Sequence, residues 1–275
     1  MTILQALILG LVQGLTEFIP VSSTAHLFLA QEILGITNDA NALSFDIVLH
    51  LGTALALIVV FWRDLIGMVV ETFRWIARKP PIYPEDRGLI VPLIIGTIPG
   101  VLAGLTLLKK MEEVRSILLI GISMIVAFVY FFVAETIGQR SADRDNVTVW
   151  DAIWVGLAQA AAGLMAGFSR SGFTISTGRI TGLSRPRATR FSFLLALIII
   201  LGAGAKTVLD LHKHPQPSLP LNLLLAGFVS SAVFGFISVT FLLRYLRTHT
   251  LKPFGVYLLL LGCTLIGWHF LHAAH

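Results

Sequence analysis

The first apolar region of the chain is broken by the polar stretch Gln13-Gly-Leu-Thr-Glu-Phe-Ile-Pro-Val-Ser-Ser-Thr-Ala-His26. It divides residues 1–36 into two apolar pieces, each shorter than the about 20 residues that a membrane-crossing helix needs. Pro20 marks a point where the chain can turn and a second helix can begin. Irregular backbone at membrane depth is tolerated only where it is buried in protein or lines a cavity. The stretch therefore predicts a re-entrant hairpin or a broken helix with a polar tip inside the protein.

A second region of the same kind covers residues 150–183. Its two short apolar pieces flank the stretch Ala166-Gly-Phe-Ser-Arg-Ser-Gly-Phe-Thr174, which is rich in glycine and hydroxyl groups and carries one arginine. For the same reason we expect a second hairpin or broken helix here.

The rest of the chain supplies long apolar runs. Six runs reach the length of a span, at roughly 43–62, 88–108, 115–135, 190–210, 221–243 and 252–274. Residues 64–77 mix charged and apolar side chains, which fits either an interfacial helix or a short span. Hydrophobic residues make up 56% of the chain and charged residues 13%, whereas soluble domains carry about 25% charged residues. This composition excludes a soluble, disordered or nucleic-acid-binding chain and predicts a polytopic helical membrane protein.

Basic residues are distributed unevenly between the two faces of the membrane. If both broken regions return to the side they came from, one face receives 14 Lys and Arg residues and the other receives five. The larger group is Arg63, Arg74, Arg78, Lys79, Arg87, Arg140, Arg144, Arg179, Arg185, Arg187, Arg190, Arg244, Arg247 and Lys252. The smaller group is Lys109, Lys110, Arg115, Lys206 and Lys213. Because cytoplasmic loops carry the excess of basic residues, we expect both termini and the mouth of the first hairpin to face outward.

The two broken regions are interpreted as the starts of an internal repeat, with a chance match of the segment pattern as the alternative. Displacing the sequence by 146 residues places Gly10 on Gly156 and Gln13 on Gln159. Each broken region is followed by three long spans, and because three is odd the second copy is inverted relative to the first. Inverted repeats with broken helices are typical of transporters, whose binding site lies where the repeats meet.

The expected fold is therefore all-α. It is a single integral membrane domain over residues 1–275, a polytopic helical bundle with an inverted internal repeat and two re-entrant hairpins. The first repeat covers about residues 1–140 and the second about 150–275.

The polar residues of the first break suit the binding of an anion. Gln13 and Glu17 are four residues apart and share one face of a helix. After the proline, the helix start contains the hydroxyl groups of Ser22, Ser23 and Thr24, followed by His26. Hydroxyls and free N–H groups at a helix start attract an anion.

The second break adds a permanent positive charge. Arg170, flanked by Ser169 and Ser171, carries a planar donor fork that matches phosphate. Together the two breaks supply a phosphoryl-transfer set, in which a serine can attack phosphorus, a histidine can move protons and an arginine can neutralise the phosphoryl oxygens.

Each of these residues also has a purely structural explanation. The hydroxyl residues of the first break can serve only as N-caps. His26 can be a hydrogen-bonded buried histidine, and Gln13 can hold two helices together. Glu17 and Arg170 are harder to explain in this way, because charges at membrane depth are costly and are by default functional or paired.

Several polar residues outside the breaks are given structural roles. Asp46 and Asp210 are interpreted as pairing or helix-end residues. His50 can face the same cavity, but a satisfied interhelical histidine is favoured. The simplest role for Arg185, Arg187 and Arg190 is a cytoplasmic loop anchored to lipid headgroups.

At these residues the sequence resembles the undecaprenyl-diphosphatase family, membrane enzymes linked to bacitracin resistance. The first family motif is Glu or Gln, three residues, Glu, and then Pro-Val-Ser-Ser-Thr-x-His, which Gln13 to Glu17 and Pro20 to His26 match. The second is Pro-Gly-x-Ser-Arg-Ser-x-x-Thr, which residues 166–174 match after their first position. The later stretch Arg190-Phe-Ser-Phe-Leu-Leu also resembles the family, so the resemblance covers nearly the whole chain.

The resemblance implies hydrolysis of undecaprenyl diphosphate to the monophosphate, which recycles the carrier lipid of peptidoglycan synthesis in the bacterial inner membrane. It implies an outward-facing site and dependence on a divalent cation, Mg²⁺ or Ca²⁺. The expected partners are the polyprenyl diphosphate lipid, the membrane and, as an alternative to a monomer, a second copy in a homodimer.

The resemblance also assigns roles to residues. Ser23 becomes the candidate nucleophile, His26 the acid or base, Glu17 the base or a metal ligand, and Arg170 a catalytic cation. Which of Ser23 and His26 forms a covalent intermediate is left open. The candidate substrate-binding residues are Ser22, Thr24, Ser169, Ser171, Thr174 and Gln13, and Gln13 is also a candidate metal ligand.

The sequence departs from the family pattern at three places. Ala166 replaces the motif proline, Ile198 stands where a proline is expected, and Leu258 follows Tyr257 where an arginine is expected. Gln13 supplies no second negative charge, so a metal ion would be held less tightly than by two carboxylates. The alternative function is a polyprenyl-phosphate transporter or flippase that uses the same pocket without hydrolysis. The serine, histidine and arginine favour the enzyme, because transport needs no nucleophile beside a proton carrier.

Overall fold

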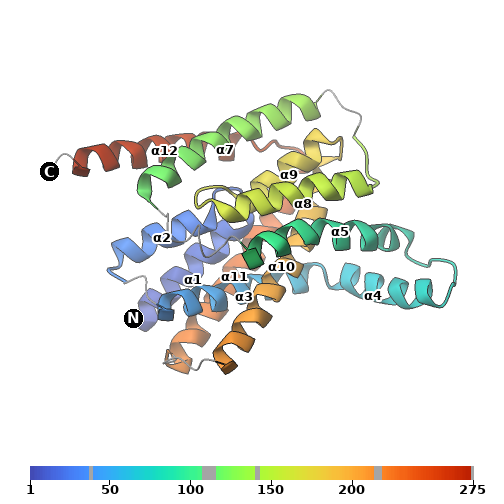
Figure 1. The fold of residues 1–275 in the computed structure, drawn as a ribbon, viewed down its shortest axis with the longest axis horizontal. Helices are drawn as coiled ribbons and strands as arrows, with labels where there is room; N and C mark the ends of the chain where they lie inside the picture. The colour runs from blue at the N-terminus through green and yellow to red at the C-terminus, as the bar shows by residue number, and fades with distance from the viewer. Residues whose placement is uncertain (37–39, 107–115, 140–142, 214–218, 274–275) are drawn as a thin grey trace.

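The computed structural model of this chain describes residues 1–36, 40–106, 116–139, 143–213 and 219–273, which form eleven helices (Figure 1). The helices are α1 (Ile3–Phe18), α2 (Ser23–Ile33), α3 (Ala40–Val60), α4 (Trp62–Ile76), α5 (Pro84–Thr106), α7 (Ile117–Gly138), α8 (Val149–Leu164), α9 (Arg170–Ile180), α10 (Arg185–Lys213), α11 (Leu221–Tyr245) and α12 (Lys252–Ala273). Four basic residues from the charge asymmetry, Lys109, Lys110, Arg115 and Arg140, lie outside the described residues. So do the span ends predicted at 107–108, 115 and 274.

Five of these helices are long and apolar enough to cross a membrane, namely α5, α7, α10, α11 and α12. They coincide with five of the six predicted spans. The prediction of a polytopic helical membrane protein is therefore confirmed.

The sixth predicted span, residues 43–62, ends in a sharp bend. The axes of Ser44–Val60 and Trp62–Ile76 differ by 76°, and together the two segments can make one bent span. The bend contains neither proline nor glycine. It lies at Phe61, whose buried ring contacts the edge of Phe193 at a centroid distance of 6.4 Å. Beyond the bend, α4 runs alongside α5 (Figure 1), so residues 64–77 form a helix packed on a span rather than one lying flat at the interface.

Both predicted broken regions are hairpins of two short helices, α1 with α2 and α8 with α9. α1 and α8 have 16 residues each, which gives about 24 Å of helix against a hydrocarbon core of about 30 Å. α1 stops at Ile19 because the residue before a proline avoids the helical conformation. In the second hairpin the turn passes through Gly167, whose φ of +102° strongly favours glycine. Neither hairpin helix is long enough to span.

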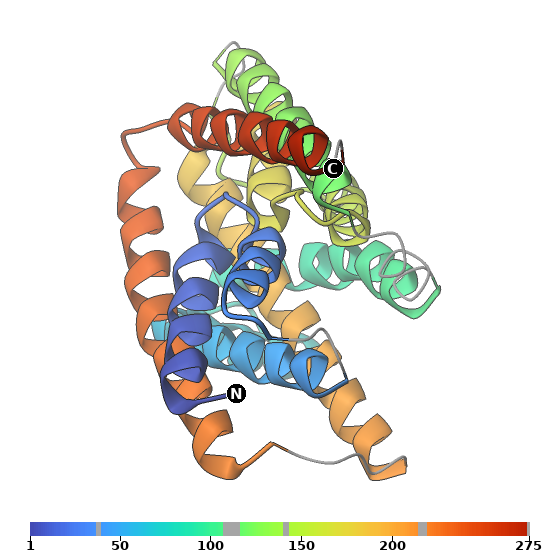
Figure 2. The same cartoon turned by 90° about the vertical axis from the view of Figure 1, so that its left-hand side faces the viewer.

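Each hairpin packs on a span from the other half of the chain. α1 lies against α11, and α8 lies against α5. At both places two glycines let the backbones approach: a Cβ on Gly10 would lie 2.5 Å from the carbonyl oxygen of Gly227, and a Cβ on Gly156 would lie 2.5 Å from that of Gly96. The end-on view shows the α1–α2 hairpin in the middle of the molecule (Figure 2). This reciprocal packing is the arrangement expected of two interlocked repeats, and the inverted repeat and its bounds stay predictions.

The arginines at the start of α10 join helices. The pairs are Arg185 with Glu135, Arg187 with Glu85, and Arg190 with Asp64 and Asp86. These arginines form ion pairs that join α10 to α4, α5 and α7. The expectation that they anchor a loop to lipid headgroups is therefore corrected. The pairing roles predicted for Asp46 and Asp210 are confirmed, since Asp46 accepts a hydrogen bond from Gln31 at 2.8 Å and Asp210 lies 3.9 Å from Lys206.

Candidate active site

Glu17, near the end of α1, is the centre of the candidate site. Its Oε2 accepts hydrogen bonds from Gln13 Nε2 at 2.8 Å and from Ser23 Oγ at 2.7 Å, and its Oε1 accepts one from Arg170. The His50 ring approaches Oε2 to 3.6 Å. The Glu17 side chain is only 2% exposed, and a buried carboxylate is tolerated when donors surround it. The shared helix face predicted for Gln13 and Glu17 is confirmed.

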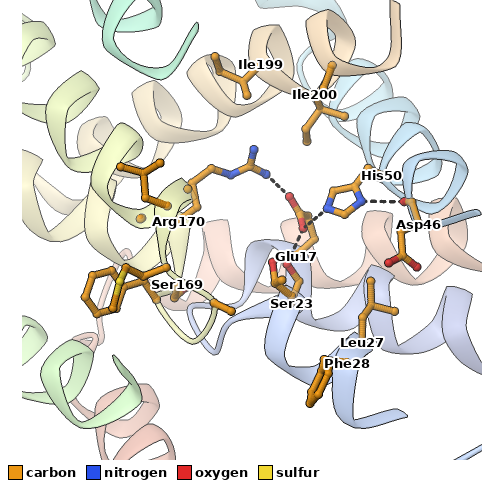
Figure 3. A pocket seen from close by; sticks show the side chains of 18 of the residues that line it. Glu17, Ser23, Leu27, Phe28, Asp46, His50, Ser169, Arg170, Ile199 and Ile200 are labelled. Atoms are coloured by element: carbon orange, nitrogen blue, oxygen red, sulfur yellow. Dashed lines mark hydrogen bonds and ion pairs between the residues drawn. The ribbon is translucent and has the colours of Figure 1, made fainter. Parts of the chain in front are cut away.

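Arg170 reaches Glu17 from the second hairpin. It is the first residue of α9, whose N-cap Ser169 accepts a hydrogen bond from the Gly172 N–H at 3.2 Å. The Glu17–Arg170 pair joins residues 153 positions apart and brings the tips of both hairpins together (Figure 3). Both second helices, α2 and α9, therefore begin at the same place. Helix starts carry partial positive charge and unpaired N–H groups, so the site suits an anion.

The turn before α2 holds a strained residue. Ser22 has φ 71° and ψ 86°, a left-handed conformation that favours glycine, and its buried Oγ has no hydrogen-bond partner. Such a conformation costs on the order of 1–3 kcal/mol and persists only where the surroundings enforce it. Here it allows α2 to begin directly after the turn, with Ser23 Oγ facing Glu17.

His26 lies on α2 but is turned away from this centre. Its Nδ1 lies 2.8 Å from the carbonyl oxygen of Ser22, and its Nε2 lies 2.6 Å from the hydroxyl of Tyr257 on α12. The two rings also stack, with centroids 5.7 Å apart. His26 does not line the cavity described below. The structure therefore places the histidine that the resemblance makes an acid or base against α12, where it holds the strained turn.

His50, on α3, takes the place beside Glu17 instead. Its Nδ1 lies 2.7 Å from the carbonyl oxygen of Asp46, and its Nε2 faces the Glu17 carboxylate (Figure 3). The sequence favours an interhelical histidine here, whereas the structure gives it a place in the cavity wall. The spacing of His50 from Asp46 could have indicated this position from the sequence. The two residues are four apart, which puts two polar groups on one face of a largely apolar helix.

The remaining hydroxyl residues divide into two groups. Ser23, Thr24 and Ser169 line the cavity. Ser171 and Thr174 do not: the Ser171 Oγ lies 3.3 Å from that of Ser169, and the buried Thr174 hydroxyl bonds to Ser192 on α10 at 2.6 Å. Ser22 and Gln13 do not line the cavity either. The substrate-binding roles predicted for all of these residues stay predictions.

The cavity has a volume of about 480 Å³, within the range of small-molecule sites. Its polar lining residues are Glu17, Ser23, Thr24, Gln31, Asp46, His50, Ser169 and Arg170, and its larger apolar residues are Leu27, Phe28, Ile47, Leu164, Met165, Phe168, Ile199 and Ile200. A lining with charged side chains beside apolar side chains suits a ligand that has an anionic headgroup and an apolar chain.

The residues predicted to hold a divalent cation do not form a ready-made metal site. Mg²⁺ and Ca²⁺ take six or more oxygen ligands. Both oxygens of Glu17 already accept hydrogen bonds, one of them from a guanidinium. The Oε1 of Gln13 is a buried acceptor without a partner. No group of three or more His, Cys, Asp and Glu residues that could hold a metal occurs in the described part of the chain. In this arrangement the carboxylate of Glu17 is committed to its hydrogen-bond donors, and the dependence on Mg²⁺ or Ca²⁺ stays a prediction.

Fold and site together define a class, the polytopic helical membrane proteins with an anion site built from two hairpins inside the membrane domain. Comparison with known proteins identifies the family. Residues 6–264 match the family described as Bacitracin resistance protein BacA. The chain belongs to this family.

Curated relatives of similar length share about two fifths of their residues with this chain. It is 38% identical to the undecaprenyl-diphosphatase of Rubrobacter xylanophilus over 256 residues, which covers 93% of this chain and 94% of the relative. It is 38% identical to the undecaprenyl-diphosphatase of Moorella thermoacetica over 268 residues, 97% of each chain. The undecaprenyl-diphosphatase of Geotalea daltonii is 40% identical over 265 residues, 96% of this chain and 97% of the relative.

Proposed function

We propose that this protein hydrolyses undecaprenyl diphosphate to undecaprenyl phosphate and inorganic phosphate in the bacterial cytoplasmic membrane, and so recycles the carrier lipid of peptidoglycan synthesis. The observation that carries the proposal is the meeting of Ser23, Glu17 and Arg170 in one cavity with an apolar wall. The names of the relatives agree with it. Membership of the BacA family supports a role in bacitracin resistance.

In the first step Ser23 Oγ forms a bond to the terminal phosphorus while its proton passes to Glu17 Oε2, 2.7 Å away. The bond between that phosphorus and the bridging oxygen breaks, and its electron pair leaves on the polyprenyl phosphate. Water then attacks the phosphoserine. Ser23 Oγ departs with the proton held by Glu17, and the hydrogens of the water leave on inorganic phosphate. The Ser23–Glu17 contact supports Ser23 over His26 as the nucleophile, because a base must lie within hydrogen-bond reach of the proton that it takes.

Arg170 has two tasks in this sequence. In the free protein its guanidinium neutralises Glu17, which weakens that carboxylate as a base. A bound phosphoryl group competes for the guanidinium, so substrate binding itself increases the proton affinity of Glu17. The freed donor fork then stabilises the charge that builds on the phosphoryl oxygens.

The mouth of the cavity faces the outside of the cell in this proposal, because the face with more basic residues belongs in the cytoplasm. A homodimer stays a prediction.

The test is the release of phosphate from a polyprenyl diphosphate by the purified protein in detergent, with and without EDTA. We expect turnover by the wild type and a loss of about 10³-fold or more in Ser23→Ala. Movement of labelled lipid across vesicles without release of phosphate would instead support the transporter. Loss of turnover in EDTA that added Mg²⁺ or Ca²⁺ restores would establish the cation dependence.

A further inference from the structure

The ring of His50 lies between two hydrogen-bond acceptors. Nδ1 is 2.7 Å from the carbonyl oxygen of Asp46, and Nε2 is 3.6 Å from the carboxylate of Glu17. A neutral imidazole carries one N–H and so can donate to only one of them, whereas an imidazolium donates at both nitrogens. Only a ring with an N–H at each nitrogen can donate to both acceptors. The side chain is 31% exposed, and its exposed part lines the cavity.

The cavity lining offers few donors to an anion. Among the described residues of its lining, Glu17 and Asp46 are acidic and Arg170 is basic, and the His50 ring can add an N–H donor. A polyanionic headgroup is held more firmly when more than one such donor faces it. The Asp46 carboxylate is occupied by a hydrogen bond from Gln31 at 2.8 Å.

Arg170 and His50 lie on opposite sides of Glu17. Arg170 bonds to Oε1 from the second hairpin, and His50 faces Oε2 from α3. In Figure 3 they approach the carboxylate from opposite directions, with Ile199 and Ile200 across the space between them. One phosphoryl group can take the place of Glu17 as the partner of one of these two side chains. A diphosphate has two linked phosphoryl groups and can engage both side chains.

We propose that Arg170 and His50 divide the diphosphate headgroup between them, so that His50 is the residue that makes the site prefer a diphosphate over a monophosphate. Arg170 binds one phosphoryl group, and His50 Nε2–H donates to the other. Ser23 and Glu17 lie between Arg170 and His50. This assignment rests on the proposed function and names the source of its substrate preference.

The experiment measures binding of two probes to the purified full-length protein in detergent by calorimetry. Methylenediphosphonate carries two phosphonate groups and resists hydrolysis, and methylphosphonate carries one. We expect the wild type to bind the diphosphonate more tightly. His50→Ala should weaken diphosphonate binding about 10- to 100-fold, the range for one hydrogen bond to a charged group, and change methylphosphonate binding by less than about threefold. His50→Gln should recover part of the loss, because its side-chain amide keeps an N–H donor.

The matched control is His249→Ala. His249 is an exposed histidine between α11 and α12 whose hydrogen-bond partners are Thr248 and Tyr245, and it lines no part of the cavity. It should bind both probes as the wild type does. Equal weakening of both probes in His50→Ala, or no weakening of either in a folded His50→Ala or His50→Gln, would overturn the proposal. A wild type without preference for the diphosphonate would do the same.

Turnover of a polyprenyl diphosphate is measured on the same samples. If the wild type binds the two probes as expected but releases no phosphate, the proposed function fails and the assignment of His50 stands. If the wild type turns over while the His50 variants keep its KM and its probe preference, the assignment fails alone.

Discussion

Glu17 contacts more residues of the candidate site than any other residue described there. Its two oxygens face donors from α1, α2, α3 and α9, so one carboxylate connects both hairpins to the first span. A group with this many donors is held firmly in its ionised form. It can act as a base only when one of the donors is drawn away, and Arg170 is the donor that a phosphate competes for most directly.

Arg170→Lys separates a phosphate clamp from a simple ion pair. Lysine keeps the charge and can still pair with Glu17, but it lacks the planar fork that binds two oxygens. We expect kcat to fall by about 30- to 1000-fold, equivalent to about 2–4 kcal/mol for one preorganised donor, with little change in the thermal midpoint. Steady-state kinetics and thermal unfolding in detergent measure the two quantities. Normal turnover, or loss of activity through unfolding alone, would return Arg170 to a structural role.

Tyr257→Phe tests the role of His26. The substitution removes the hydroxyl that contacts His26 Nε2 at 2.6 Å and leaves the ring stacking in place. A hydrogen bond of this kind contributes about 1 kcal/mol, so we expect a lower thermal midpoint in detergent and unchanged turnover of polyprenyl diphosphate. Loss of turnover in a variant with wild-type stability would show instead that His26 acts in the reaction and needs Tyr257 to do so.

The two histidines show how far the sequence could predict the site. The motif and the cost of intramembrane charge were enough to find Glu17, Ser23 and Arg170. The sequence places Ser23 and His26 in one motif, but it does not say which other helix packs against His26, and Tyr257 of α12 contacts its ring. His50 stands in a long apolar run, where a cavity-facing histidine and an interhelical one leave the same pattern.

At the scale of the elements, hydropathy predicted the spans because length and apolar content define them. The bend between α3 and α4 left no such signal, since neither proline nor glycine stands at Phe61, whose buried ring contacts Phe193. The arginines of α10 were misjudged because their partners are set by tertiary packing. Whether a guanidinium meets a lipid headgroup or a carboxylate depends on the neighbouring helix, and here Glu135 on α7 receives Arg185.

The contact of each hairpin with the other half of the chain can be tested by adding one methyl group. Gly10→Ala and Gly156→Ala would each place a Cβ 2.5 Å from a backbone oxygen of the facing helix, closer than atoms can lie without movement. We expect each to destabilise the protein by about 1–3 kcal/mol, the usual cost of overpacking, seen as a lower thermal midpoint in detergent. Gly202→Ala, with no atom within 4 Å of the new Cβ, is the matched control and should be neutral or stabilising. Equal midpoints for all three variants would contradict the close packing.

The whole molecule has two chemically different ends. Both termini lie on one side of the view in Figure 1, and the connection between α4 and α5 lies on the other. Near the second end, the ion pairs of Arg185 and Arg190 tie α10 to α4, α5 and α7. The excess of basic residues predicts that this end is cytoplasmic, which would place the termini and the mouth of the first hairpin outside.

Labelling of single cysteines in intact cells tests this orientation. Cys263 is exposed and must first be replaced by serine. In that background a cysteine at Arg247, an exposed position after α11, should be protected from a membrane-impermeant thiol reagent, and one at Lys213, an exposed position at the end of α10, should react. Permeabilised cells are the control, because both positions should react there. The expectation rests on 14 basic residues against five. The reverse pattern would place the cavity mouth in the cytoplasm, and the lipid would then reach the site from the inner leaflet.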